Sequence, residues 1–245
     1  MIVRITTPQA ASRGWVMGND VMDLDQLASW LGRDSRELGK LANRGSLPGR
    51  KIGGEWRFAT AEIHHWLERE MPSLSDRELR VLDPVSTVDD CPPLISSLLP
   101  LECIDLALPA RTRDSVLREL VKLAEKSDRV WNAEAILDAI RARETLASTA
   151  RPEGFAIPHP RRRIPDTLSE TVIALARTGS GIPFGGDRGA VTDLFFLVCC
   201  TDDALHLQVL ARLARLLRQP GLLESLRMAV TPLEARELIE AAEGE

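Results

Sequence analysis

Residues 154–200 read GFAIPHPRRRIPDTLSETVIALARTGSGIPFGGDRGAVTDLFFLVCC and decide the fold of the second half of the chain. They contain three short runs that are rich in β-forming residues, GFAIP, ETVIALAR and TDLFFLVCC. Turns with glycine and proline separate these runs, as is typical of short strands. We therefore predict that this stretch supplies strands to a sheet.

Further strands and helices are predicted on both sides of this stretch. CIDLAL at 103–108 predicts another strand, and apolar residues at helical spacing predict helices over 113–126, 132–144, 202–217 and 221–229. A last helix opens with a capping box, Thr231 to Glu234, that has proline at its first helical position. Such a mixture predicts an α/β (α+β) domain over 99–245, with helices flanking a mixed sheet. The pattern does not predict the strand order.

Residues 22–71 predict a second, smaller domain. DLDQLASWLG predicts a helix with a capping box of Asp23 and Gln26, and SRELGKLANRG predicts a second helix that ends at Gly45. SLPGRKIGGEWRF predicts a hairpin around Gly53-Gly54, and TAEIHHWLERE predicts a closing helix. Two helices joined by a short turn, followed by a hairpin and a third helix, predict a winged helix-turn-helix.

The remaining segments have weaker patterns. Residues 1–21 show no sustained period and are predicted to form a disordered arm. Residues 72–98 are polar and contain several prolines, so we predict a linker, with a short helix near Asp76 to Leu82.

Composition excludes several classes of protein. No apolar run approaches the ~20 residues that span a bilayer, and the first residues show no export signal, so we expect a cytoplasmic protein. The four cysteines are scattered, and the adjacent His64 and His65 point in different directions on their helix. We therefore predict no metal site. Cys199 and Cys200 are expected to be reduced thiols packed in a strand.

Positive charge is concentrated in the smaller domain. Residues 31–60 hold seven basic and three acidic residues, a local charge of +4. The residues that we expect to contact DNA are Arg36, Lys40, Asn43 and Arg44 on the second helix, and Lys51 and Arg57 on the hairpin. The segment resembles the excisionase/MerR-like helix-turn-helix family, whose wing pattern is matched from Arg44-Gly45 to Arg57. Acids and bases balance over 22–71, and Glu37 would repel phosphate, so docking to a protein is the alternative.

His159 is the candidate catalytic residue of the larger domain. The chain has no HExxH, GxSxG or Walker motif, which argues against a metallohydrolase, an esterase or an NTPase. An imidazole can itself be a nucleophile, and phosphoryl transfer requires little beyond positioning and cations. Pro158 and Pro160 restrict the backbone on both sides of His159, and the arginines at 161–163 suit a phosphoryl group or an acidic partner.

Three ordered motifs carry a second resemblance. EGFAIPHPR around His159, RETLAST from Arg143 and HLQVLARLARLL from His206 resemble the IIA domains of the phosphotransferase system (PTS), of the fructose/mannitol and nitrogen-regulatory type. The resemblance implies phosphohistidine phosphotransfer, in which His159 accepts a phosphoryl group from an HPr-type phosphocarrier, without another cofactor. It implies that Arg143 lies near the active site and that His206 orients the phosphohistidine. The start of its helix should keep His206 neutral.

These observations leave three functions open. The first is a transcriptional regulator in which phosphorylation of His159 alters DNA binding. The second is the IIA component of sugar transport, which passes its phosphoryl group to a IIB domain and uses the helix-turn-helix for docking. The third is an interaction scaffold whose histidine is unreactive.

Overall fold

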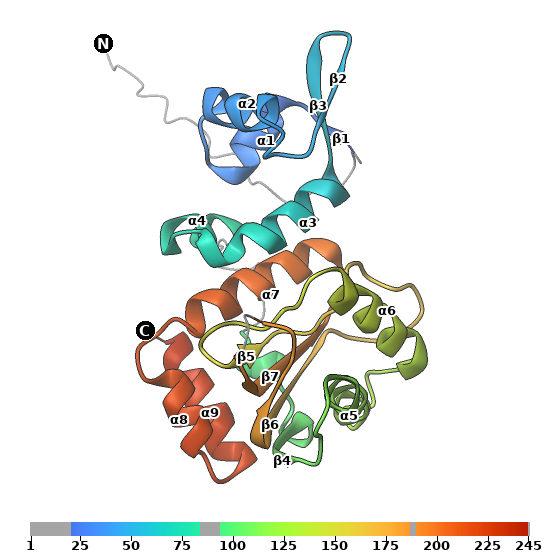
Figure 1. Cartoon of the computed structure of the whole chain (residues 1–245), viewed down its shortest axis with the longest axis vertical. Helices are drawn as coiled ribbons and strands as arrows, with labels where there is room; N and C mark the ends of the chain where they lie inside the picture. The colour runs from blue at the N-terminus through green and yellow to red at the C-terminus, as the bar shows by residue number, and fades with distance from the viewer. Residues whose placement is uncertain (1–20, 84–93, 187–189, 245) are drawn as a thin grey trace, which may run out of the picture. The chain divides into compact units, whose positions relative to one another are not determined.

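A computed structural model of the chain describes residues 21–83, 94–186 and 190–244. The chain forms two compact units, Met1–Ile63 and His64–Glu245 (Figure 1). The arm expected over residues 1–21 lies outside the described residues, except for Val21.

The first unit has the helices and the hairpin expected of a helix-turn-helix domain. Its elements are β1 (Val21–Met22), α1 (Leu24–Leu31), α2 (Ser35–Asn43), β2 (Arg50–Ile52) and β3 (Glu55–Ala59), and the start of α3 (Thr60–Glu70). The Asp23 and Gln26 capping box begins α1, and Gly32 ends it in a left-handed conformation. The strands form an antiparallel sheet in the order β1-β3-β2. Pairing of β1 with β3 was not predicted.

Two glycines close the hairpin of the first unit. Gly53 and Gly54 have φ values of 62° and 87° between the paired residues Ile52 and Glu55. Positive φ at both central residues is the type I′ geometry that suits the twist of a hairpin, and only glycine adopts it at little cost.

The second unit is built on a four-stranded mixed sheet. Its strands are β4 (Ile104–Leu108), β5 (Phe155–Ala156), β6 (Val172–Ile182) and β7 (Thr192–Cys199), in the order β4-β6-β7-β5. The central pair β6 and β7 is antiparallel, whereas β4 and β5 lie parallel to their neighbours. The first half of β6, residues 172–176, and most of β7 are buried on both faces, which explains their continuous apolar runs.

Helices cover both faces of this sheet. The helices of the second half are α5 (Arg113–Glu125), α6 (Ala133–Leu146), α7 (Asp203–Leu216), α8 (Leu222–Met228) and α9 (Pro232–Glu243), with short 3-10 turns at Ser96–Leu98 and Leu101–Cys103. On one face α5 and α6 share a core with alternate residues of β6 and β7. On the other side α7 contacts β7 and α9 contacts β4 (Figure 1). The mixed α/β fold predicted from the sequence is therefore confirmed.

The segment predicted to be a linker begins with ordered structure. After α3, a 3-10 turn (Met71–Ser73) and helix α4 (Asp76–Leu82) continue into the second unit. Helix α4 packs against α7, with Leu79 and Leu82 buried. The adjoining Asp83 is 1% exposed and pairs with Arg212 and Arg215 at 2.7 and 2.8 Å. This segment therefore belongs to the second unit, at least as far as Asp83.

None of the helices within the described ranges is both long enough and apolar enough to cross a bilayer.

Candidate functional site

His159 lies in the loop that follows β5, and its ring is held by the main chain. The backbone is fixed by a hydrogen bond from the Val198 amide to the Pro158 carbonyl oxygen, 3.0 Å long. The ring nitrogen Nδ1 lies 2.7 Å from the carbonyl oxygen of Ile157. Since a carbonyl oxygen only accepts hydrogen bonds, Nδ1 carries the proton, and Nε2 of the neutral ring keeps its lone pair.

His206 lies beside His159 and comes from another element. It occupies the first turn of α7, where the Asp202 side chain caps the helix by accepting hydrogen bonds from the amides of Ala204 and Leu205. The centroids of the two imidazole rings are 5.1 Å apart. His206 is 8% exposed and His159 is 4% exposed, so both rings are shielded from bulk water.

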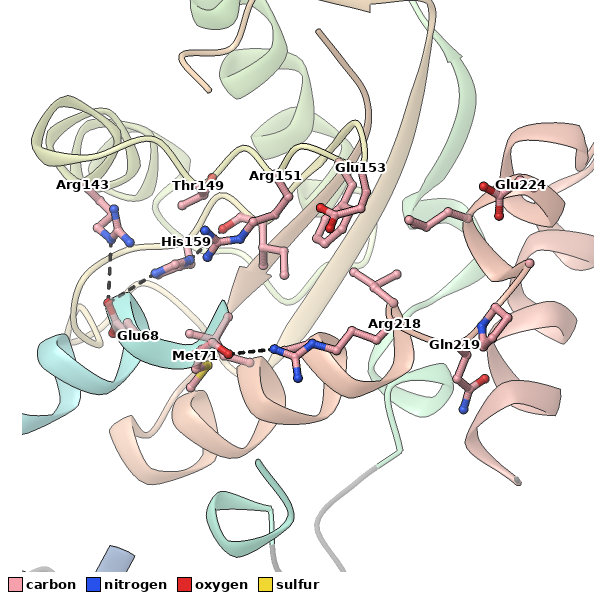
Figure 2. A pocket seen from close by; sticks show the side chains of 18 residues that line it. Glu68, Met71, Arg143, Thr149, Arg151, Glu153, His159, Arg218, Gln219 and Glu224 are labelled. Atoms are coloured by element: carbon pink, nitrogen blue, oxygen red, sulfur yellow. Dashed lines mark hydrogen bonds and ion pairs between the residues drawn. The ribbon is translucent and has the colours of Figure 1, made fainter. Parts of the chain in front are cut away.

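A glutamate of α3 lies between the two histidines. Oε2 of Glu68 is 3.5 Å from Nε2 of His159, and Oε1 is 3.6 Å from Nε2 of His206. The carboxylate is 5% exposed. Figure 2 shows it directed at His159 and Arg143. An anionic group therefore faces the lone pair of His159.

Arg143 completes the cluster from the last turn of α6. Its Nε lies 3.7 Å from Oε2 of Glu68, and its NH1 group donates a 2.8 Å hydrogen bond to the carbonyl oxygen of Ala147. The loop beyond it is held by the buried Glu144 carboxylate, which accepts hydrogen bonds from the Thr149 amide and hydroxyl. Burial raises the pKa of Glu144 above its ordinary value.

The electrostatics of the cluster favour neutral histidine and ionised glutamate. Burial lowers the pKa of His159 below its ordinary value, against the opposing effect of Glu68. Burial alone would raise the pKa of Glu68, but the adjoining His159 and His206 outweigh it and lower the pKa below its ordinary range. The lowered pKa favours the neutral ring of His159, in which Nε2 carries a lone pair.

A cavity of about 390 Å³ opens beside His159 (Figure 2). Arg143, Arg151 and Arg218 line it together with Glu68 and His159. Arg218 is fixed by hydrogen bonds to the main-chain carbonyl oxygens of Met71 and Leu74, at 3.0 and 2.7 Å. Glu153 and Glu224 line the cavity as well, but its three guanidinium groups can bind a phosphoryl group or another anion.

The structure brings together the three catalytic residues predicted from the sequence, Arg143, His159 and His206. The residues predicted to contact DNA all lie in the first unit. Arg36, Lys40, Asn43, Arg44 and Lys51 are exposed there, whereas Arg57 is partly buried and pairs with Glu55 at 2.7 Å. The three arginines after His159 are exposed, and the Arg163 amide is bound by Asp203.

Glu68 is the member of the site that the sequence did not indicate. It follows the apolar residues Ile63, Trp66 and Leu67, and periodicity in a helix does not identify a partner that is 91 positions away. Trp66, Leu67 and Glu68 are all buried, but the sequence shows only an acid after two apolar residues. This pattern does not reveal that the acid is buried.

Two families match this chain. Residues 97–242 match "Phosphoenolpyruvate-dependent sugar phosphotransferase system, EIIA 2", and residues 21–71 match "Helix-turn-helix domain". Both resemblances found in the sequence are therefore confirmed.

Relatives of the second half include transport and regulatory proteins. The chain is 35% identical over 134 residues to the PTS system fructose-specific EIIA component of Haloferax volcanii, across 54% of this chain and 85% of that protein. It is 35% identical over 136 residues to a nitrogen regulatory protein of Bradyrhizobium diazoefficiens, across 54% and 86%. The crystal structure of the nitrogen regulatory protein IIA-Ntr from Neisseria meningitidis matches with a TM-score of 0.53 and 27% identity, over 59% of this chain and 98% of that one.

Proposed function

Because the chain belongs to the phosphoenolpyruvate-dependent sugar phosphotransferase system EIIA 2 family, we propose that His159 accepts a phosphoryl group and thereby regulates DNA binding by the helix-turn-helix domain. The donor is an HPr-type phosphocarrier. The Nε2 lone pair of His159 forms the new N–P bond while the N–P bond of the donor phosphohistidine breaks. The donor imidazole takes the electron pair of the broken bond.

The geometry around His159 supports this transfer. The Ile157 carbonyl oxygen holds the proton on Nδ1, 2.7 Å away, so Nε2 is the nucleophile. The ring that results carries positive charge, and the same carbonyl oxygen stabilises it. Arg143 lies on the side of Nε2, where its charge offsets the negative charge of the phosphoryl oxygens, and the neutral ring of His206 can donate one hydrogen bond to them.

The position of the Glu68 carboxylate supports regulation of DNA binding by phosphorylation. It faces Nε2 of His159 at 3.5 Å, where a phosphoryl group would have to be placed. The carboxylate and a phosphoryl group would occupy the same space, and both are anionic, so they repel each other. Phosphorylation of His159 therefore requires Glu68 to leave. Because Glu68 is on α3, which begins directly after the wing strand β3, its release changes the helix that closes the DNA-binding domain.

The exposed face of α2 provides the DNA contacts of this proposal. Arg36, Lys40, Asn43 and Arg44 are exposed on or next to α2, and Leu38 and Ala42 on its other side are buried. This arrangement leaves a polar and basic helix face available for a major groove. Lys51 on the hairpin is exposed as well and is placed to contact phosphate.

The alternative is a IIA component that passes its phosphoryl group to a IIB domain in sugar transport. The 35% identity to a fructose-specific EIIA component favours it. In that case the first unit serves for protein docking, and the partly buried Arg57, which is paired with Glu55, is unavailable to phosphate.

A labelling experiment tests the transfer. The full chain is incubated with phosphoenolpyruvate, enzyme I and HPr, and the phosphorylated residue is located by mass spectrometry of its peptides. We expect one phosphoryl group on His159, lost in acid and stable in base, and none in His159→Gln. The matched control is His65→Gln, because Nδ1 of His65 lies 3.6 Å from the same Glu68 oxygen and we expect its loss to leave the labelling of His159 intact. Equal labelling of His159→Gln would overturn the proposal.

A further inference from the structure

We propose that Glu68, His159 and His206 also form a binding site for a divalent transition metal ion, with Zn²⁺ the best match. The inference concerns the unphosphorylated chain. Metal binding itself does not depend on the proposed phosphotransfer.

Three buried donor atoms meet without a hydrogen-bond partner. They are Oε2 of Glu68 and Nε2 of His159 and of His206, and within the described part of the chain none of the three is satisfied. Nε of Arg143 and Nδ1 of His65, which adjoin the same carboxylate at 3.7 and 3.6 Å, lack hydrogen-bond partners in this part of the chain as well. One donor atom from each residue lies within 4.8 Å of the others. Buried polar atoms are nearly always paired, so three unsatisfied ones at a single point indicate a missing partner.

The distances between the Glu68 oxygens and the two Nε2 atoms match those between ligands of one metal ion better than those of direct hydrogen bonds. Direct hydrogen bonds to nitrogen are about 2.7–3.2 Å long, whereas the two carboxylate–imidazole distances are 3.5 and 3.6 Å. Zinc–nitrogen and zinc–oxygen bonds of about 2.0–2.2 Å in a tetrahedron separate neighbouring donors by roughly 3.3–3.6 Å. The two distances run to different oxygens of Glu68, and the three donors lie within 4.8 Å of one another, so a zinc ion fits after shifts of roughly 1 Å.

The orientation of His159 is also that of a metal ligand. Its Nδ1 is bound to the Ile157 carbonyl oxygen at 2.7 Å, so the Nε2 lone pair points toward Glu68. Metal-binding histidines commonly donate their other ring N–H to a carbonyl or carboxylate, which fixes the tautomer.

The donor set selects the class of ion. Two imidazoles and one carboxylate suit Zn²⁺ or Co²⁺, whereas Mg²⁺ and Ca²⁺ prefer sites made of oxygen donors. Arg143 lies 3.7 Å from Oε2 of Glu68, so a bound ion would replace it at this oxygen. A fourth position faces the adjoining cavity, which Glu68 and His159 both line. A water molecule or an anion would complete the tetrahedron there.

A bound ion would affect the site in two ways. It would tie Glu68 of α3 to both histidines, and it would occupy the Nε2 lone pair that phosphoryl transfer requires. The second effect rests on the proposed function and predicts that Zn²⁺ and phosphorylation exclude each other.

Cobalt titration of the full chain tests the site. Metal-free protein is titrated with Co²⁺ under reducing conditions, and visible absorption is followed. We expect intense bands of tetrahedral Co²⁺ at one ion per chain, and their loss when one equivalent of Zn²⁺ is added. Glu68→Ala and His206→Gln should each weaken binding by at least about tenfold, whereas Glu70→Ala on the same helix should leave it unchanged.

Thermal stability and near-ultraviolet absorption distinguish this site from binding elsewhere on the chain. Zn²⁺ should raise the Tm of the wild type and of Glu70→Ala but not of His206→Gln, whose folding is checked by circular dichroism. Thiolate-to-cobalt absorption in the near ultraviolet would assign the ion to cysteine and overturn the site. So would binding that Glu68→Ala leaves intact, or no binding at one equivalent. Transfer from already phosphorylated HPr to His159 is measured separately in EDTA, so failure of the metal site leaves the proposed function standing.

Discussion

Nδ1 of His159 lies 2.7 Å from the Ile157 carbonyl oxygen, and this contact decides which ring nitrogen can react. It leaves Nε2 facing Glu68, with Arg143 and His206 beside it. A nucleophile and the anion that blocks it are thus placed by two short segments, the loop after β5 and the end of α3.

The buried thiols permit a prediction about single residues. Burial raises the pKa of Cys103 to about 11 and that of Cys199 to about 12. Because only the thiolate reacts, and a raised pKa moves its formation to higher pH, both thiols are un-ionised at pH 8. We expect iodoacetamide at pH 8 to leave both unmodified in the native chain and to alkylate them in urea. Mass spectrometry of the peptides measures this, and rapid alkylation of the native chain would contradict it.

Among the elements, α2 contains a glycine that its helix does not need. A Cβ added at Gly39 would meet Cδ2 of Leu24 at 3.5 Å, an ordinary contact. Since alanine favours a helix by about 1 kcal/mol over glycine, we expect Gly39→Ala to raise the free energy of unfolding of the first unit by about 0.5–1 kcal/mol. Chemical denaturation measures it. Gly53→Ala, at a φ of 62°, is the control that should destabilise, and a destabilised Gly39→Ala would contradict the packing described for α2.

The contact between α4 and α7 depends on a buried carboxylate. Asp83 is 1% exposed and pairs with Arg212 and Arg215. Removing one partner of a buried ion pair costs about 3–5 kcal/mol, so we expect Asp83→Ala to destabilise the second unit by that amount. Asp76→Ala on the same helix, where the carboxylate is exposed, should cost less than about 1 kcal/mol. Equal effects of the two variants in urea unfolding would contradict the buried pairing.

Elements were predicted well where their signals are local. The capping box at Asp23, the glycine pair of the hairpin and the N-cap at Thr231 all lie where the sequence indicated. The strand order was not predictable, because the residues of an apolar strand do not specify which other strand it pairs with. Pairing of Asp83 with α7 and of Glu68 with the histidines was missed for the same reason, because both join segments that are far apart in the chain.

For the whole molecule, the proposal requires that DNA binding depend on salt. Phosphate contacts release counterions, so log affinity should fall linearly with log salt, and each lost contact should reduce the slope by about 0.9. We expect Arg36→Ala and Lys40→Ala to lower both affinity and slope for a fragment taken from upstream of its own gene. Arg80→Ala, an exposed arginine of α4, is the control. Binding that is insensitive to salt, or to both α2 variants, would favour the docking function.

The central claim is that Glu68 and a phosphoryl group on His159 exclude each other. The most direct measurement is the initial rate of phosphoryl transfer from phosphorylated HPr to the full chain, metal-free, for wild type, Glu68→Ala and Glu70→Ala. The account predicts transfer to His159 that is about tenfold faster in Glu68→Ala, where the carboxylate no longer faces Nε2, and an unchanged rate in Glu70→Ala. A rate in Glu68→Ala equal to that of the wild type, with the same residue labelled, would contradict it.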